Sequence, residues 1–137
     1  MDTTKIGNIT EGALLSSLMR SGRVVLIPFG TQDDYDIVFE EGGRFFKVQC
    51  KTAHTVKGVM IFNAYTVVRD KDTKKYHNRY YGEKIDFFGV YCPENGKCYL
   101  VPVSEITAKA KVHLRLVPPK NNQKKRILMA EDYELRE

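Results

Sequence analysis

Apolar residues follow two different periods along this chain, and the change of period separates a helix from a sheet. From Ile6 to Ser21 they recur every three or four residues, and Gly22 follows where a glycine commonly ends a helix. Downstream they come in short runs bounded by glycine, proline and asparagine. The pattern predicts one N-terminal helix followed by a sheet.

Six apolar runs predict strands, over residues 24–29, 35–40, 44–52, 59–67, 86–92 and 97–103. The turn sequence EGG joins the second run to the third, and PENG joins the fifth to the sixth, so each pair is expected to form a hairpin. Ser104 as an N-cap predicts a short helix over 104–111, followed by a strand near 113–117 and a short C-terminal element. This order predicts an α/β (or α+β) domain with a central mixed sheet flanked by helices.

The chain length predicts a single domain. With 137 residues and no internal repeats, we expect one domain over residues 1–137, with a C-terminal extension from about 118. No apolar run approaches the ~20 residues of a membrane-spanning helix. The N-terminal residues lack the basic and apolar regions of a signal peptide. We therefore expect a cytoplasmic protein with no membrane partner.

Positive charge, with a net value of +5, is concentrated in two segments. Residues 71–81 carry four basic side chains and one acidic side chain among tyrosines, and residues 109–126 carry seven basic side chains and no acidic one. Such runs are often plain solvated surface, but two of them favour a polyanionic partner, above all nucleic acid. The side chains predicted to contact DNA are Lys74, Lys75, Arg79, Tyr80, Lys124, Lys125 and Arg126.

The cysteines and histidines argue against a zinc site. Cys50, Cys92 and Cys98 form no CxxC pair, and the three histidines are scattered along the chain. In a cytoplasmic protein we expect these thiols to be reduced.

One carboxylate stands out on the predicted helix. Glu11 precedes Leu14, Leu15 and Leu18 by three, four and seven residues, so it shares their stripe on the face that packs on the sheet. A buried charge is costly unless it is paired or binds a cation. Glu11 could cap a loop or pair with an arginine; alternatively, the helix delivers it to a site at the sheet.

The predicted first hairpin brings further polar groups to the same place. Asp33 and Asp34 are expected to serve the turn before the strand, but pairing across EGG places Asp36 beside residues 48–52. Gln49 and Lys51 project from one face of that strand. The ordinary alternation of polar and apolar residues on a half-exposed strand would give the same pattern. The expected convergence of these residues with the Glu11 carboxylate favours a functional site instead.

The chemistry of this cluster suits a hard divalent cation, which takes oxygen ligands. Asp36 offers a carboxylate, Gln49 an amide oxygen, and the backbone of Cys50 a carbonyl. A lysine beside the metal can orient water and stabilise charge on a phosphate. The expected reaction is metal-assisted hydrolysis of a phosphodiester.

The pattern E11…D36…Q49-C-K51 resembles the PD-(D/E)XK nuclease superfamily. More narrowly, the segments GNITEGALLSSLMRSG, YDIVFEEGGRFFKVQCKT and IDFFGVYCPENGKCYLVPV resemble the group I intron-encoded PD-(D/E)XK homing endonucleases. The likeness covers roughly residues 5–117, and its early segments are also similar to archaeal Holliday junction resolvases.

The resemblance implies a restriction-endonuclease-like core that cleaves double-stranded DNA at specific sites, as a homodimer or homotetramer. It implies Mg²⁺ as the cofactor, with Mn²⁺ substituting and Ca²⁺ binding without turnover. The catalytic residues would be Glu11, Asp36, Gln49 and Lys51. The metal would be held by Asp36, Gln49, the Cys50 carbonyl and, through water, Glu11.

Two positions depart from the family motif. Tyr35 replaces its proline, which carries no chemistry, and Gln49 replaces its acidic residue, which removes one negative charge from the metal site. Two alternatives therefore stay open: a structure-selective nuclease similar to a Holliday junction resolvase, and a DNA-binding module that does not cleave.

Overall fold

The computed structural model describes residues 1–30, 34–81, 84–107, 110–121 and 127–137. The helical elements that lie wholly within these residues are α1 (Thr3–Arg20) and the short 3-10 turns η2 (Val103–Glu105) and η3 (Ala130–Asp132). The strands are β1 (Val24–Leu26), β2 (Ile37–Glu41), β3 (Arg44–Thr52), β4 (His54–Val56), β5 (Val59–Asn63), β6 (Tyr65–Arg69), β7 (Tyr76–Tyr80), β8 (Phe87–Cys92), β9 (Lys97–Pro102), β10 (Lys111–Arg115) and β11 (Leu128–Met129). Among the described residues, no helix combines the length and apolar character needed to cross a membrane.

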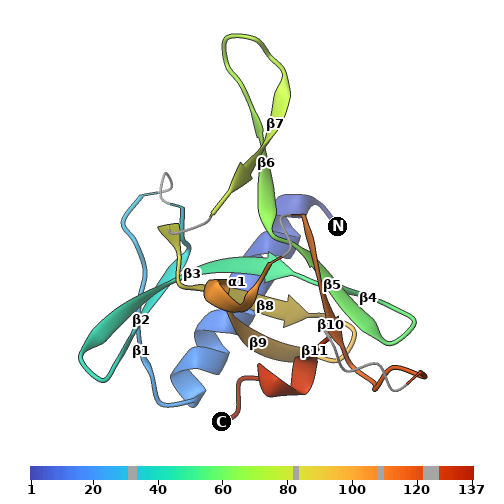
Figure 1. Cartoon of the computed structure of the whole chain (residues 1–137). Helices are drawn as coiled ribbons and strands as arrows, with labels where there is room; N and C mark the ends of the chain where they lie inside the picture. The colour runs from blue at the N-terminus through green and yellow to red at the C-terminus, as the bar shows by residue number, and fades with distance from the viewer. Residues whose placement is uncertain (31–33, 82–83, 108–109, 122–126) are drawn as a thin grey trace.

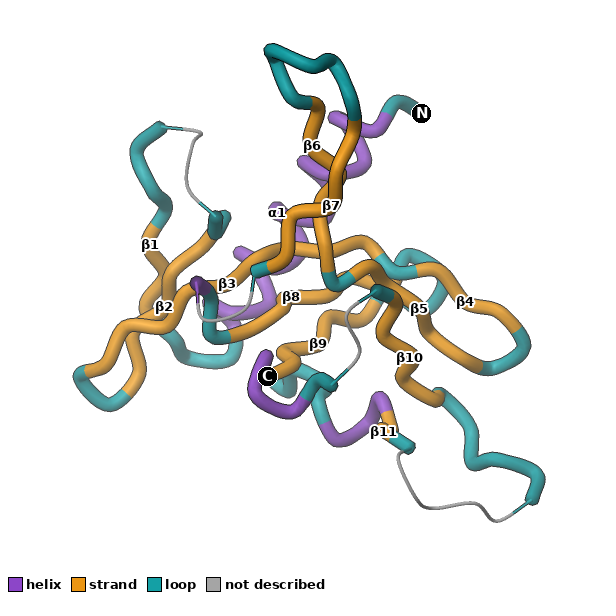
Figure 2. The backbone as a smooth tube through the Cα atoms, turned by 45° about the horizontal axis from the view of Figure 1, so that its top comes forward, coloured by secondary structure: helices purple, strands orange, loops and turns teal. Residues whose placement is uncertain are grey.

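The central sheet has five strands in the order β1-β2-β3-β8-β9. β3 and β8 run parallel, while the other neighbours are antiparallel, so the sheet is mixed as the sequence predicts. A second sheet has the order β11-β10-β5-β4, and β6 and β7 form a separate two-stranded ribbon. Figure 1 shows this ribbon projecting from the body of the molecule, and it extends beyond the other strands in Figure 2 as well.

Helix α1 packs on one face of the central sheet because its apolar stripe matches the alternation of the strands. Leu14 and Leu18 are fully buried against Phe39 and Val48. A Cβ atom on Gly89 would lie 2.8 Å from Val48 Cγ1 and 3.0 Å from Leu14 Cδ1, so only a glycine lets the helix approach β8 this closely.

The opposite face of the central sheet builds a second core with the four-stranded sheet. Phe88 and Val101 alternate with the residues that face α1, and they pack with Phe62 from β5 and Leu114 from β10. Ala130 of η3 is buried in the same core, which ties the C-terminal residues to it.

The N-terminal helix and both hairpins are confirmed, whereas two other predictions are wrong. The strand expected over 59–67 is two strands, because the chain leaves the second sheet at Ala64 and enters the ribbon. In its described residues, the helix expected over 104–111 is reduced to a 3-10 turn, η2, that includes only Ser104 and Glu105 of it; Ile106 is extended, and β10 already begins at Lys111. Val103 and Ile106 pack on the core instead.

Candidate active site

Asp36 is fixed by the backbone of β3. It lies just before β2, and its own N–H donates to the Val48 carbonyl at 2.9 Å. Its Oδ2 accepts a hydrogen bond from the Cys50 N–H, also at 2.9 Å. The hairpin therefore holds this carboxylate beside residues 48–50, and it does so with main-chain atoms.

Gln49 and Lys51 face away from helix α1, on the other side of β3 from Val48 and Cys50, which pack with the helix. Gln49 lines a cavity of about 180 Å³. The other residues around this cavity are Asp34, Asp36, Thr66, Arg79 and Tyr81. The cavity thus lies between the first hairpin and the base of the β6–β7 ribbon.

Glu11 approaches the same region from helix α1. The preceding residue, Thr10, is buried, and its Oγ1 lies 2.5 Å from Thr52 Oγ1, which fastens the helix to the end of β3. Glu11 itself is half-buried at the border of the apolar stripe. Its pKa is raised by burial and further by the charge of Asp36. The two carboxylates are therefore close enough to repel one another.

Burial sets the direction of the pKa shifts in this cluster. It raises the pKa of Asp36, against the opposing effects of the Cys50 N–H bond and the Lys51 charge. It lowers the pKa of Lys51 to about 8, although Asp36 opposes that shift. It also raises the pKa of the Cys50 thiol, which is consistent with an unreactive core side chain.

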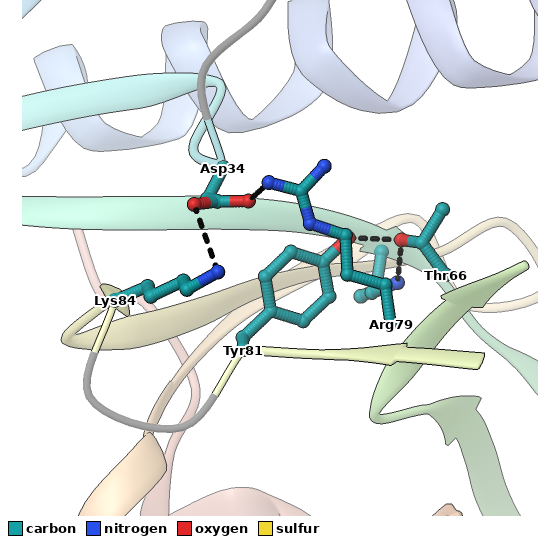
Figure 3. A network of polar contacts seen from close by, with 6 residues as sticks. Asp34, Thr66, Arg79, Tyr81 and Lys84 are labelled. Atoms are coloured by element: carbon teal, nitrogen blue, oxygen red, sulfur yellow. Dashed lines mark hydrogen bonds and ion pairs between the residues drawn. The ribbon is translucent and has the colours of Figure 1, made fainter. Parts of the chain in front are cut away.

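The Lys51 ammonium is held by the ribbon. Its Nζ donates to the Tyr65 carbonyl at 2.9 Å and to Thr66 Oγ1 at 3.4 Å, and it lies 5.0 Å from the centre of the Tyr81 ring. Thr66 Oγ1 is in turn hydrogen-bonded to the Tyr81 hydroxyl (Figure 3). Sequence reasoning missed Thr66 and Tyr81, because it took 59–67 as one strand; Asn63, at the end of β5, is the one signal of a break in that run.

Arg79 also points toward this cavity. It forms an ion pair with Asp34, whose other oxygen lies 3.8 Å from Lys84 Nζ (Figure 3). Asp34, expected to serve only a turn, thus connects the segment before β2 to the ribbon. Asp33 lies outside the described residues.

The other predicted DNA contacts are distributed as follows. Lys74 and Lys75 are exposed in the turn of the ribbon, and Tyr80 is exposed on β7 beside its cross-strand partner Tyr65. Tyr81, by contrast, is buried edge-on against Phe88. Lys124, Lys125 and Arg126 lie outside the described residues.

The donor set fits a hard cation. The described residues contain no cluster of three or more histidine, cysteine, aspartate or glutamate side chains that could hold a metal. The candidate ligands are instead two carboxylates, one amide and one backbone carbonyl, from Glu11, Asp36, Gln49 and Cys50. All of them offer oxygen, the donor that Mg²⁺ prefers. A cation would also offset the repulsion between Glu11 and Asp36.

Comparison with known proteins agrees with this geometry. The family model described as PD-(D/E)XK endonuclease matches residues 1–136. The chain belongs to this family. Its nucleases generally use divalent metals, typically Mg²⁺. Among curated proteins no sequence matches.

One solved structure extends the likeness to the fold. The bacterial homing endonuclease I-Ssp6803I is similar with a TM-score of 0.73 and 27% sequence identity, over 97% of this chain and 89% of that one. The restriction-endonuclease-like fold expected from the sequence is therefore confirmed, as is the family. The protein is a DNA nuclease of the PD-(D/E)XK class.

Proposed function

We propose that this PD-(D/E)XK endonuclease is a homing-type enzyme that cleaves double-stranded DNA at specific sites. The observation that carries the proposal is the meeting of Asp36, Gln49 and Lys51 at one hairpin, with Glu11 delivered by α1. The similar fold of I-Ssp6803I, a bacterial homing endonuclease, supports the biological role.

Each member of the cluster has a distinct role in this proposal. Asp36, Gln49 and the Cys50 carbonyl hold Mg²⁺, and Glu11 reaches it through water. When bound, the cation makes a coordinated water more acidic and offsets charge that develops on the phosphate. Mn²⁺ would substitute, and Ca²⁺ would bind without turnover.

Lys51 supports the attack with its remaining hydrogen-bond capacity. An ammonium group has three donors, and the Tyr65 carbonyl and Thr66 Oγ1 occupy two of them. The third has no acceptor among the described residues and could orient the attacking water or bind a phosphate oxygen. The positive charge of Lys51 would also stabilise the phosphate as negative charge builds on it.

We further propose that the whole chain acts as one domain and works as a homodimer or homotetramer. One site cuts one strand, so cutting both strands of a palindrome-like target calls for two copies related by symmetry. The edge strand β1 and the segment after it expose large apolar side chains that suit an interface between copies. They are Val24, Leu26, Ile27 and Phe29.

A cleavage screen tests the proposal. The purified protein is incubated with Mg²⁺ and either randomised duplexes or four-way junctions, and all new ends are sequenced. We expect cuts in duplex DNA at one recurrent sequence, and none with Asp36→Ala. Cuts confined to junctions would support the structure-selective alternative. No cutting by the wild type would support the non-cleaving module.

A further inference from the structure

The hydrogen bonds that hold the Lys51 ammonium come from outside the β2–β3 hairpin, which carries Asp36 and Gln49. Within the part of the chain that the structure describes, both hydrogen-bond acceptors of its ammonium, the Tyr65 carbonyl and Thr66 Oγ1, belong to β6 of the projecting ribbon. A lysine side chain is long and flexible, so its charge has a defined position only where such contacts hold it. The ribbon therefore decides where the Lys51 charge lies relative to Asp36, with which it interacts.

We propose that Thr66 is a positioning residue for Lys51, and that Tyr81 acts on Lys51 through Thr66. The inference rests on the proposed cleavage reaction and assigns roles to two residues outside the PD-(D/E)XK motif. Thr66 Oγ1 accepts a hydrogen bond from the ammonium and has a second hydrogen bond to the Tyr81 hydroxyl. Because two partners engage this hydroxyl, its orientation toward Lys51 is set.

Tyr81 is suited to anchor this arrangement. Its side chain is buried, and its ring packs edge-on against Phe88 of the central sheet with centroids 6.0 Å apart. The same ring lies under the Lys51 ammonium at a distance typical of a cation–π contact. Tyr81 thus links the core to Thr66, and Thr66 links the ribbon to the lysine.

This arrangement places two tasks on one element. The turn of the ribbon exposes Lys74 and Lys75, which are predicted to contact DNA, while its base holds Lys51. The ribbon would then position both the bound DNA and the Lys51 ammonium that acts at the reacting phosphate. Loss of the Thr66 hydroxyl should consequently impair the reaction step and leave DNA binding intact.

The first test compares two substitutions at one position. Thr66→Val removes the hydroxyl and keeps the shape, whereas Thr66→Ser keeps the hydroxyl and removes a methyl group. We expect Thr66→Val to lower the single-turnover cleavage rate at saturating enzyme by about tenfold or more, the scale of losing a hydrogen bond to a charged group. Thr66→Ser should stay within about threefold of the wild type, less than one broken charged hydrogen bond would cost.

Three further readouts separate positioning from folding. The affinity for DNA, measured in Ca²⁺, and the thermal unfolding midpoint should change little in either Thr66 variant. Thr55→Val, which removes a hydroxyl from β4 in the second sheet, serves as the matched control and should cleave normally. In the wild type, the Lys51 ammonium protons should exchange slowly enough to observe by NMR, and Thr66→Val should speed that exchange.

Tyr81→Phe tests the second half of the proposal. Tyr81→Phe should slow cleavage by less than Thr66→Val does. The double variant Thr66→Val/Tyr81→Phe should cleave no more slowly than Thr66→Val alone, because the effect of the Tyr81 hydroxyl passes through Thr66. A rate unchanged in Thr66→Val, or lowered equally in Thr66→Ser, would overturn the positioning role. A wild type that cleaves no DNA would instead refute the proposed function, so the two failures are distinguishable.

Discussion

At the scale of single residues, the candidate site depends on the way main-chain atoms hold one carboxylate. The Cys50 N–H fixes Asp36, so the position of its oxygens follows from the hairpin register and not from neighbouring side chains. Lys51 has no such main-chain anchor on its own hairpin and relies on β6. Changes at the two residues should therefore abolish the same reaction for different reasons.

Asp36→Ala and Lys51→Ala should each abolish cleavage and leave DNA affinity largely intact, because phosphate contacts elsewhere dominate binding. Asp132→Ala, at an exposed aspartate of η3, is the matched control and should behave as the wild type. Cleavage assays in Mg²⁺ and binding assays in Ca²⁺ provide the two measurements. Equal loss of binding and cutting in both folded variants would contradict the assignment.

Glu11→Gln should slow cleavage less than Asp36→Ala does, because Glu11 is expected to reach the metal through water. Burial and the charge of Asp36 raise the pKa of Glu11, which means that its ionised form is disfavoured in the metal-free fold. The variant should therefore unfold at a higher temperature than the wild type in EDTA. Normal cleavage combined with a lower midpoint would make Glu11 a structural ion-pair partner.

Gln49→Glu tests the metal through stability. A third carboxylate beside Asp36 and Glu11 adds repulsion in metal-free protein, so the unfolding midpoint in EDTA should fall. Mg²⁺ or Ca²⁺ binds the folded state, and the added charge should enlarge the rise in midpoint that either ion causes. Gln49→Leu should abolish most of that rise. Equal rises in wild type, Gln49→Glu and Gln49→Leu would show that position 49 does not contact the ion.

At the scale of elements, two contacts determine how the site is assembled: α1 against β8, and the ribbon against β3. The helix brings Glu11 to the sheet only because Gly89 leaves room for Leu14. The ribbon brings Arg79 to Asp34 and the Tyr65 carbonyl to Lys51. The geometry of the candidate site thus depends on how these elements pack, although Asp36, Gln49 and Lys51 all come from one hairpin.

Gly89→Ala should destabilise the protein by about 1–3 kcal/mol, the usual cost of an extra methyl group in a packed core. The new Cβ would lie 2.8 Å from Val48 Cγ1, so the helix or the strand must shift. Gly7→Ala on α1 is the matched control, because no atom lies within 4 Å of its added Cβ. It should raise stability by about 0.5–1 kcal/mol, the helix preference of alanine over glycine. Denaturant unfolding measures both.

The ribbon turn should contribute charge and little chemistry. Lys74→Gln/Lys75→Gln should flatten the slope of log affinity against log salt by about 0.9 for each phosphate contact that is lost. Lys57→Gln, in the β4–β5 turn, is the matched control, because Lys57 and Lys74 both have positive φ angles, of 49° and 58°. An unchanged slope in the double variant would show that DNA follows another path.

At the scale of the whole molecule, predictability from sequence ends where contacts become non-local. The helix with Glu11 and the hairpin with Asp36 and Lys51 follow from local periodicity and a glycine turn. The break at Ala64 is marked only by Asn63, a residue disfavoured in strands, while the runs on both sides of it fit a strand equally well. Thr66 and Tyr81 could not be predicted for that reason, since their contacts with Lys51 exist only once the ribbon folds back.

The assembly state gives a final prediction. Phe29 is fully exposed, and Leu26 at the end of edge strand β1 and Ile27 just after it are also exposed, which is costly for a monomer in water. If two copies meet there, Ile27→Ser/Phe29→Ser should lower the molecular mass measured by sedimentation to that of one chain of 15.7 kDa. Val56→Ser, at an exposed valine of β4, controls for general loss of surface hydrophobicity.

The cleavage products of that variant should change as well. A monomer retains its own Asp36 and Lys51, so it should still cut one strand, and nicked duplexes should replace double-strand breaks. If the monomeric variant only nicks DNA while Val56→Ser still cuts both strands, each of the two cuts must come from a separate copy of the chain. A wild type that remains monomeric at micromolar concentration, both free and on its target duplex, would contradict the proposed assembly and leave the assignment of the catalytic cluster in place.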